Sequence, residues 1–166
     1  YFRVNSLVCW SWGLCINDNT SIREKMQHFW YHLIPVNFDD IRNQQHNAAT
    51  MSHDYMSLLR TNALGDFKAL TKAIAKMPAM LVYLGNQYST ASVPNENFAR
   101  ELMELFTMGK VPFQNYTEGD VIAASKVLSG WRVSGFNAAY PFVTTFNSTY
   151  HNQSNKVFSS NFGNTT

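Results

Sequence analysis

Three side chains near the start of the sequence have the types and the spacing of a metal site. Glu24, His28 and His32 recur every four residues, so in a helix they project from one face. Two histidines one turn apart can bind zinc or another divalent transition metal. The HExxH arrangement of many zinc enzymes is absent, and we favour a partly exposed polar face over a metal site. A complete site would need ligands from elsewhere in the chain, for which the candidates are His53, Asp54, Glu101 and His151.

A second set of polar side chains lies in the segment PNENFARELMELFTMG, residues 94–109. This segment predicts an amphipathic helix that ends at Gly109, because the residue after a helix often adopts the left-handed backbone conformation that glycine favours. Its polar face carries Glu96, Arg100, Glu101 and Glu104. Because Arg100 lies one turn from both Glu96 and Glu104, we predict that it pairs with carboxylates and fixes the packing of the helix. The alternative is a general acid and base pair, which requires carboxyl groups with separated pKa values.

Charged residues elsewhere complete the candidates. His151 and Lys156, in the closing segment, could join a polar site, with a solvated loop as the more ordinary interpretation. Lysines at positions 68, 72 and 76 recur every four residues and could contact an anionic glycan or phosphate, although such a row usually keeps a helix soluble. No GxSxG motif, P-loop or dinucleotide-binding fingerprint occurs, so the common hydrolase and nucleotide chemistries lack support.

Composition limits the classes of protein. The 166 residues fit one domain, and 45% of them are hydrophobic while only 14% are charged, so a globular core is expected. A net charge of +2 demands no nucleic acid, and we predict no nucleic-acid partner. The apolar run between Leu7 and Ile16 is shorter than the ~20 residues that a bilayer requires, so no transmembrane helix is expected. Because Tyr1 opens the sequence, we expect a processed product or part of a longer protein.

The two cysteines lie in the run CWSWGLC. The spacing of Cys9 and Cys15 fits neither a paired zinc motif nor a thioredoxin motif. We favour two small buried hydrophobic residues over a local disulfide bond, which would need an oxidising compartment.

Local signals predict a series of helices. Ser21 and Glu24 have the spacing of a capping box, and the helix that follows should end before Pro35. Its predicted buried stripe consists of Ile22, Met26, Phe29, Trp30 and Leu33. After a turn and a long polar stretch, the next helix spans residues 48–64, with Met56, Leu59 and Ala63 buried.

Later helices have their own start and stop signals. Asp66 should cap a helix that buries Leu70 and Ile74, and Pro78 should break or restart it. A short helix over residues 79–84 should end at Gly85. Thr117 and Asp120 have the spacing of an N-terminal cap, and the buried edge of this last helix consists of Val121, Ala124, Leu128 and Trp131.

The amino-acid composition changes after residue 131, where Gly, Asn, Ser and Thr are interspersed with aromatic residues. We predict a short aromatic β-hairpin or an irregular segment over residues 132–166, packed on the helices or on a partner. Residues 1–131 form the helical domain. The predicted fold is therefore mainly α, a multi-helix orthogonal bundle followed by this segment.

Three blocks of the sequence together resemble the bacterial family known as domain of unknown function 1800. They are IREKMQHFW, PNENFARELMELFTMG and YTEGDVIAASKVLSGW, at residues 22–30, 94–109 and 116–131. The resemblance implies a mainly helical, exported bacterial protein, located in the periplasm, at the cell surface or outside the cell, and often longer than this chain. It also implies a sulfatase-like companion and supplies no established catalytic residue.

The chain departs from the family pattern at two places. Many relatives have the sequence Trp-His-x-His at the end of the first block. In this chain the sequence is Trp30, Tyr31, His32 and Leu33, so Tyr31 and Leu33 replace the two histidines. Many relatives also have His-Asp where this chain has His151 and Asn152. These departures weaken a metal or acid role for those family positions.

Two functions follow from these patterns. The first is a structural or assembly component of a cell-surface or secreted complex, with a protein partner that is the sulfatase-like companion or another part of the same protein. The aromatic segment 136–162 would then contact the partner. The alternative is an enzyme that uses a divalent transition metal on the face of Glu24, His28 and His32.

Overall fold

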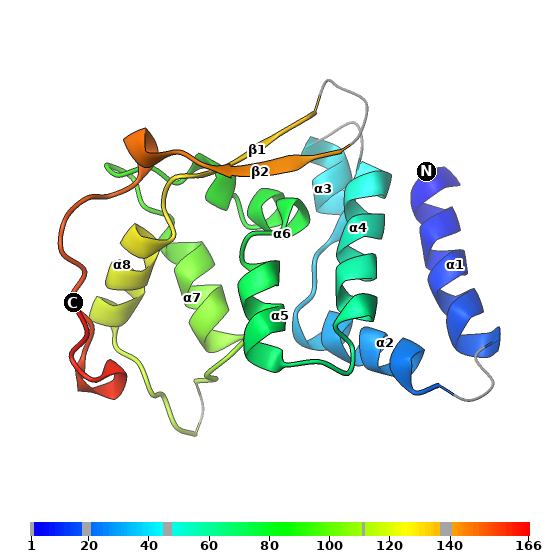
Figure 1. The fold of residues 1–166 in the computed structure, drawn as a ribbon, viewed down its shortest axis with the longest axis horizontal. Coiled ribbons are helices and arrows are strands. Elements are labelled where there is room, and N and C mark those ends of the chain that lie inside the picture. Colours follow the sequence, from blue (N-terminus) through cyan, green and yellow to red (C-terminus); the bar gives the residue numbers. More distant parts are fainter. Residues whose placement is uncertain (1, 18–20, 45–47, 111, 137–140) are drawn as a thin grey trace.

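The computed structural model describes residues 2–17, 21–44, 48–110, 112–136 and 141–166. Within these residues the fold consists of eight α-helices and one two-stranded hairpin (Figure 1). The helices are α1 (Phe2–Asn17), α2 (Arg23–Leu33), α3 (Phe38–Gln44), α4 (Ala48–Thr61), α5 (Phe67–Ile74), α6 (Pro78–Tyr83), α7 (Glu96–Glu104) and α8 (Glu118–Val127). The predicted mainly α fold with a C-terminal hairpin is therefore confirmed.

Most predicted helix starts are confirmed by the capping contacts. The Asp66 carboxylate accepts a hydrogen bond from the Ala69 N–H at 2.7 Å, and the Asn95 side chain accepts one from the Phe98 N–H at 3.0 Å. Thr117 and Asp120 form a complete capping box at the start of α8. These contacts satisfy backbone N–H groups that have no partner inside the helix.

The start and the end of α6 also follow the sequence signals. Pro78 occupies the first turn of α6, where its missing N–H costs nothing. Gly85, after α6, and Gly109 both have positive φ angles, +70° and +76°, which residues with a Cβ adopt at a cost. The predicted end of α7 at Gly109 is wrong, because the regular helix ends at Glu104.

The predicted orientation of α2 is wrong. Glu24 and Gln27 are buried, with 4% and 1% of their surface exposed, whereas Ile22, Phe29 and Leu33 are 58%, 53% and 39% exposed. The polar side of this helix therefore faces the protein, and part of the predicted core stripe faces solvent. We call Ile22, Phe29 and Leu33 the α2 stripe.

The predicted capping box of α2 is also not formed as expected. Ser21 Oγ accepts a hydrogen bond from the Arg23 N–H at 3.1 Å, but the residue before the helix is Ile22, which has no side-chain cap. The Glu24 carboxylate binds Arg60 of α4 instead. A long-range ion pair thus replaces the local interaction that the spacing suggested.

Helix α3 was missed because its sequence is polar. Asn37 starts it by accepting a hydrogen bond from the Asp39 N–H at 3.0 Å with its side chain. Ile41 is fully buried and ties the short helix to the core. Phe38 and Ile41 are the two apolar residues of this short helix, and two such residues in a polar stretch are too weak a periodic signal to predict a helix.

The described core has two parts. The larger lies among α3, α4, α5 and α6, and its largest buried side chains include Tyr55, Ile41, Leu59, Leu70 and Met80. The smaller lies between α7 and α8, and it consists of Ala99, Met103, Tyr116, Val121 and Ala124. Leu128 packs against both parts and so joins them.

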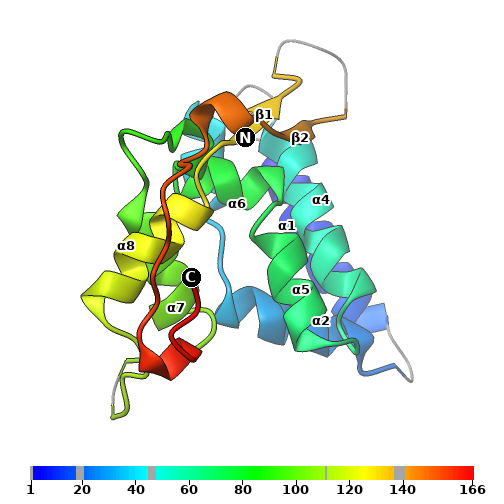
Figure 2. The same ribbon diagram turned by 60° about the vertical axis from the view of Figure 1, so that its left-hand side comes forward.

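The C-terminal segment forms a hairpin and then returns along the helices. Strands β1 (Trp131–Ser134) and β2 (Val143–Phe146) pair antiparallel, with Trp131 opposite Phe146. Trp131 was predicted at the edge of the last helix, but α8 ends at Val127. Figure 2 shows the chain after the hairpin running beside α8, and Phe158 and Phe162 pack on the smaller core. Phe158 and Phe162 thus cover the chain's own helices, and contact of segment 136–162 with a partner stays a prediction.

The first helix carries both cysteines. Cys9 and Cys15 are not joined in a disulfide bond, as favoured, but Cys9 is exposed and Cys15 is half-buried, so their predicted burial is wrong. None of the described helices combines the length and the apolar character needed to cross a bilayer.

Candidate functional site

The first predicted site residue, Glu24, is engaged by a cation from another helix. Arg60 of α4 places Nε 2.8 Å from Glu24 Oε1 and 3.0 Å from Oε2, and its Nη2 lies 2.6 Å from Oε1. The Glu24 side chain is buried while the Arg60 side chain is about half exposed. This ion pair neutralises the carboxylate and joins α2 to α4.

The two histidines of α2 contact α1 or their own helix. His28 Nε2 lies 3.1 Å from Ser11 Oγ, and the His28 ring stacks on Trp12 with centroids 5.1 Å apart. His32 Nδ1 donates a hydrogen bond to the His28 carbonyl at 2.8 Å, and its side chain is exposed. The three predicted ligands therefore share a helix face but have separate partners.

These contacts give the predicted metal site no structural support. Within the described residues, no group of three or more His, Cys, Asp or Glu side chains is arranged to hold a metal ion. Of the proposed extra ligands, His53 and Asp54 lie next to one another on α4, with His53 Nδ1 3.5 Å from Asp54 Oδ1. Metal binding by the α2 face stays a prediction.

Ser11 Oγ and His28 Nε2 are close enough to act as a nucleophile and its base. The groups around them are not those of a catalytic pair. Ser11 lies in the middle of α1, so the backbone N–H groups around it are bonded within the helix. Acyl transfer requires donors directed at the developing oxyanion. The contact is therefore better suited to holding α1 against α2.

A cavity separates α1 from its neighbours on the side of this contact. It has a volume of about 260 Å³ and is lined by apolar residues of α1, α2, α3 and α4 together with Ser11, His28 and His32. This hollow is partly open to solvent and lies beside the contacts of Ser11 and Trp12 with His28.

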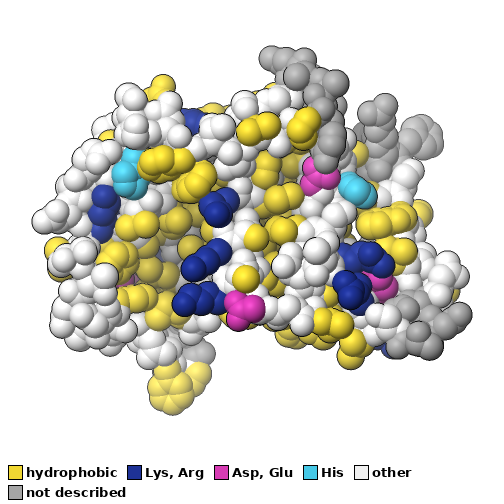
Figure 3. All heavy atoms as spheres, in the orientation of Figure 1, with side chains coloured by type: hydrophobic (Ala, Val, Ile, Leu, Met, Phe, Trp, Pro, Cys, Tyr) yellow, Lys and Arg dark blue, Asp and Glu magenta, His cyan; other side chains and the backbone are white. Residues whose placement is uncertain are grey.

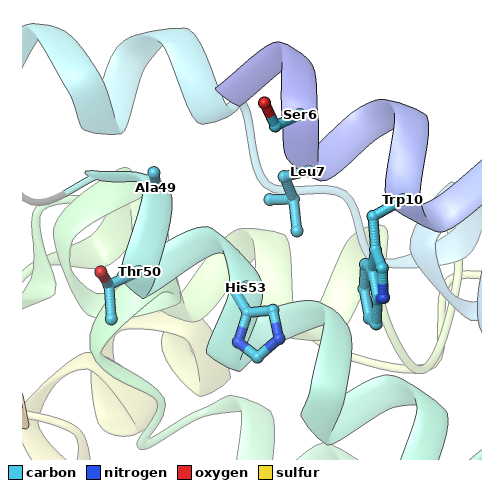
Figure 4. A pocket seen from close by; sticks show the side chains of 6 residues that line it. All are labelled: Ser6, Leu7, Trp10, Ala49, Thr50 and His53. Atoms are coloured by element: carbon cyan, nitrogen blue, oxygen red, sulfur yellow. The ribbon is translucent and has the colours of Figure 1, made fainter. Parts of the chain in front are cut away.

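A second cavity lies between α1 and α4 and is open to solvent. Figure 4 shows Trp10 and His53 opposite each other at its mouth, and their ring centroids are 5.3 Å apart. Its volume is about 370 Å³, and the remaining lining residues are Ser6, Leu7, Ala49 and Thr50. This hollow presents an indole, an imidazole and two hydroxyl groups at the exposed edge of α1.

The polar face of α7 forms an ion pair that crosses to α8. Arg100 binds Glu118 through two parallel hydrogen bonds of 2.8 and 2.7 Å. The hydrogen bond from Arg100 is the largest cause that lowers the pKa of Glu118. Pairing of Arg100 with a carboxylate is as predicted, but the partner is Glu118 and its side chain is exposed.

The other acids of α7 have different surroundings. Glu104 accepts a hydrogen bond from the Tyr116 hydroxyl at 3.2 Å and pairs with Lys110 at 3.3 Å. Among the described residues, Glu96 and Glu101 take part in none of the ion pairs. The four residues of the predicted polar face thus form no single catalytic cluster.

His151 and Lys156 join the end of α8, not the face of α7. His151 Nδ1 donates to the Ser129 carbonyl at 2.9 Å, and Lys156 Nζ lies 3.4 Å from His151 Nε2. Lys156 also donates to the Asn152 carbonyl at 2.5 Å, and Ser129 Oγ accepts from the Asn152 N–H at 2.9 Å. These bonds hold the returning C-terminal segment on the helices.

The carboxylate of Asp120 anchors the same segment, and sequence reasoning missed half of its role. It accepts hydrogen bonds from the Thr117 N–H and hydroxyl at 2.7 and 2.8 Å. It also accepts bonds of 2.7 and 2.8 Å from the Ser159 N–H and hydroxyl. The local spacing signals the first pair, but no local signal reveals a partner 39 residues later.

The surface of α1 and α2 is the candidate functional site that emerges. It combines the exposed α2 stripe, the cavities beside α1 and exposed apolar side chains of α1, among which Trp12 and Ile16 are the most exposed. The polar residues nearby are occupied by ion pairs and hydrogen bonds. Such a surface suits binding better than chemistry.

Comparison with known proteins gives one match. The sequence model of a family described as "Protein of unknown function (DUF1800)" matches residues 3–166. No curated protein and no solved structure matches the chain. The match therefore supplies a family but no relative with a known activity.

Proposed function

The chain belongs to DUF1800, a family of proteins of unknown function, and from this premise we propose that it is a structural or assembly component of an exported bacterial complex. In this proposal the α2 stripe, with the adjoining surface of α1, binds a second polypeptide. The sulfatase-like companion implied by the family resemblance is the first partner to test. Export also rests on that resemblance, and finding the native protein in the periplasmic or extracellular fraction would support it.

The observation that carries the proposal is the inverted burial of α2. An amphipathic helix at the surface of a protein normally turns its apolar side to the core. Here Glu24 and Gln27 are inside, while Ile22, Phe29 and Leu33 are exposed. Exposing three large apolar side chains to water is unfavourable in free energy. Binding of a partner that covers them removes this cost.

The neighbouring contacts keep this face from turning inward. Glu24 is fixed by Arg60, and the Trp30 indole donates a hydrogen bond to the Ala63 carbonyl at 2.9 Å. Rotating α2 to bury the stripe would break both and would leave the Glu24 carboxylate exposed. The stripe therefore stays available to a partner in the folded chain.

The experiment measures complex formation with the purified companion by light scattering after size-exclusion chromatography and by calorimetry. Replacing Phe29 and Leu33 by serine should weaken the complex at least about tenfold, since two central apolar anchors are lost. The matched control replaces Phe113 and Val157 by serine, because these residues are more exposed and lie on other segments. The control should bind like the wild type.

Two results would count against the proposal. One is a strictly monomeric chain that binds no companion at micromolar concentration. The other is equal loss of binding in the stripe variant and the control, because that would place the interface elsewhere.

The metal-dependent alternative has its own test. Metal analysis of the native protein, with His28→Ala and His32→Ala as comparisons, decides it. Stoichiometric zinc or another transition metal that disappears in both variants would favour the enzyme. We expect no such loss, because Glu24 is paired with Arg60 and His28 contacts Ser11.

A further inference from the structure

A row of lysines begins on the side of α5 opposite its buried residues and continues into the turn after that helix. Lys68, Lys72 and Lys76 are all exposed, whereas Leu70 and Ile74 are buried in the larger core. The backbones of Lys68 and Lys72 lie about one helical turn apart, about 6 Å along the axis of α5, and Lys76 follows in the turn after the helix. None of the ion pairs between described side chains involves these lysines.

An apolar hollow lies on the same face of the molecule. Its volume is about 330 Å³, and it lies between α7, α8 and the C-terminal segment. Apart from Thr165 its lining is apolar, made by Leu102, Met103, Ala124, Val127, Leu128, Phe158 and Phe162. Figure 3 shows a row of Lys and Arg side chains over α5, with hydrophobic side chains between that row and the C-terminal segment.

The hollow and the row both border side chains that pack against the larger core. Leu128 lines the hollow and also packs against the larger core, as Trp131 does. The ammonium group of Lys76 lies 6.0 Å from the centre of the Trp131 ring. Lys76 and the hollow thus each lie beside a side chain that packs against the larger core.

The spacing of the charges determines which ligand fits. A free fatty acid or a phosphate presents one centre of charge, which a single lysine satisfies. A helix with acidic residues every four positions repeats its charges at the same step of about 6 Å as the lysine row. Apolar residues on the adjoining side of such a helix would enter the hollow, as in other grooves that bind amphipathic helices.

We propose that the lysine row, formed by Lys68 and Lys72 of α5 and by Lys76 of the following turn, and the apolar hollow form one docking groove for an acidic amphipathic helix of a partner polypeptide. The inference rests on the proposed function in that the ligand is a polypeptide. The groove is formed by other elements than the α2 stripe. The inference also specifies the chemical character of the partner, which is an acidic amphipathic helix. Charge complementarity with the three lysines would orient the bound helix and speed its association. The hollow would bury the apolar side chains of that helix.

The test uses a synthetic probe. A fluorescent peptide of about 18 residues, long enough to form a helix, carries glutamates every four positions and leucines on the adjoining face. A second peptide has the same composition with the glutamates distributed around the helix. Binding of both to the whole chain is measured by fluorescence anisotropy, at low salt and again at higher salt.

The expected result has three parts. The patterned peptide binds at least about tenfold more tightly than the scrambled one, and added salt weakens the binding. The double variant Lys68→Glu and Lys72→Glu, and separately Val127→Asp in the hollow, each lower the affinity at least about tenfold. The matched control Lys25→Glu, an exposed lysine on α2, stays within about twofold of the wild type.

Several outcomes would overturn the inference. They are equal binding of both peptides, no effect of the row variants, or an equal effect of Lys25→Glu. Circular dichroism establishes that each variant is folded, and Val127 is exposed, so its substitution leaves the core intact. Binding to phosphatidylcholine vesicles that contain phosphatidylglycerol, lost in the row variant while neither peptide binds, would show a lipid face instead.

The failure of this inference is distinguishable from failure of the proposed function. If the companion binds through the α2 stripe and the peptide does not bind, only the docking groove is wrong. If the peptide binds and the companion complex is unaffected by the stripe variant, the groove stands and the assembly surface on α2 is wrong.

Discussion

Arg60 in α4 holds the buried carboxylate of Glu24 in α2, with Arg60 Nε 2.8 Å and Nη2 2.6 Å from the same oxygen. This contact decides which side of α2 faces the protein. Because the stripe on the other side is then exposed, one ion pair underlies both the orientation of the helix and the proposed binding surface.

The two partners of this ion pair should differ in their effect on stability. Arg60→Met leaves the Glu24 carboxylate buried without its cation and should lower the free energy of unfolding by about 2 to 3 kcal/mol. Glu24→Met leaves a half-exposed Arg60 that can turn to water, so it should cost only about 1 kcal/mol. Urea unfolding followed by circular dichroism measures both. Arg23→Met, on the exposed face, is the control, and an equal or reversed order would contradict the prediction.

Asp120 should give the stability a dependence on pH. Burial alone would raise the pKa of its carboxyl group, but hydrogen bonds from Ser159 and Thr117 outweigh burial and lower the pKa. A lowered pKa in the folded state stabilises the fold fully above the pKa of the unfolded chain, and the effect is lost as pH falls through the folded value.

Asp120→Asn should therefore cost about 2 kcal/mol at neutral pH, and the difference from wild type should shrink below about pH 4. Urea unfolding at a series of pH values measures this difference. Ser159→Ala removes one hydroxyl donor and should cost about 1 kcal/mol. A difference between Asp120→Asn and wild type that is constant from neutral to acidic pH would show that the carboxylate charge is not what holds the C-terminal segment.

The pair between Arg100 and Glu118 should be visible by titration. Since the hydrogen bond from Arg100 is the largest cause that lowers the pKa of Glu118, Arg100→Met should raise that pKa toward its ordinary value. Lys110 is the smallest contributor, so Lys110→Met should raise it less. Carbon-detected NMR titration of the glutamate carboxyl groups measures both shifts, and a larger shift in Lys110→Met would refute the assignment.

Gly130 should tolerate no side chain. Its φ angle is +93°, and a Cβ there would lie 2.9 Å from the Asn147 carbonyl oxygen and 3.0 Å from His151 Cβ. Gly130→Ala should therefore lower the free energy of unfolding by about 3 kcal/mol. Gly163→Ala is the matched control, because its φ is +68° but no atom lies within 4 Å of the added Cβ. It should cost about 1 kcal/mol, and equal costs would mean that the close contact is absent in solution.

Local sequence signals determined most of the helix starts. The side chains of Asp66 and Thr117 cap α5 and α8 as their spacing to the following residues predicted. Pro78 starts α6, and Gly85 follows its end. These features depend on residues within one helical turn, so the sequence contains all the information that they need.

The candidate site was less predictable, because its residues are brought together over long separations. Glu24 meets Arg60 36 residues later, and Ser11 meets His28 17 residues later. The helical spacing of Glu24, His28 and His32 correctly places them on one face, but spacing does not say what faces them.

The sequence by itself determined that this chain is mainly helical, where most helices begin and to which family it belongs. Only the tertiary structure decided that α2 buries Glu24 and exposes Phe29. The physical reason is that a buried charge is tolerated only beside an opposite charge. Whether such a partner is present depends on the packing of α4, which no pattern within α2 contains.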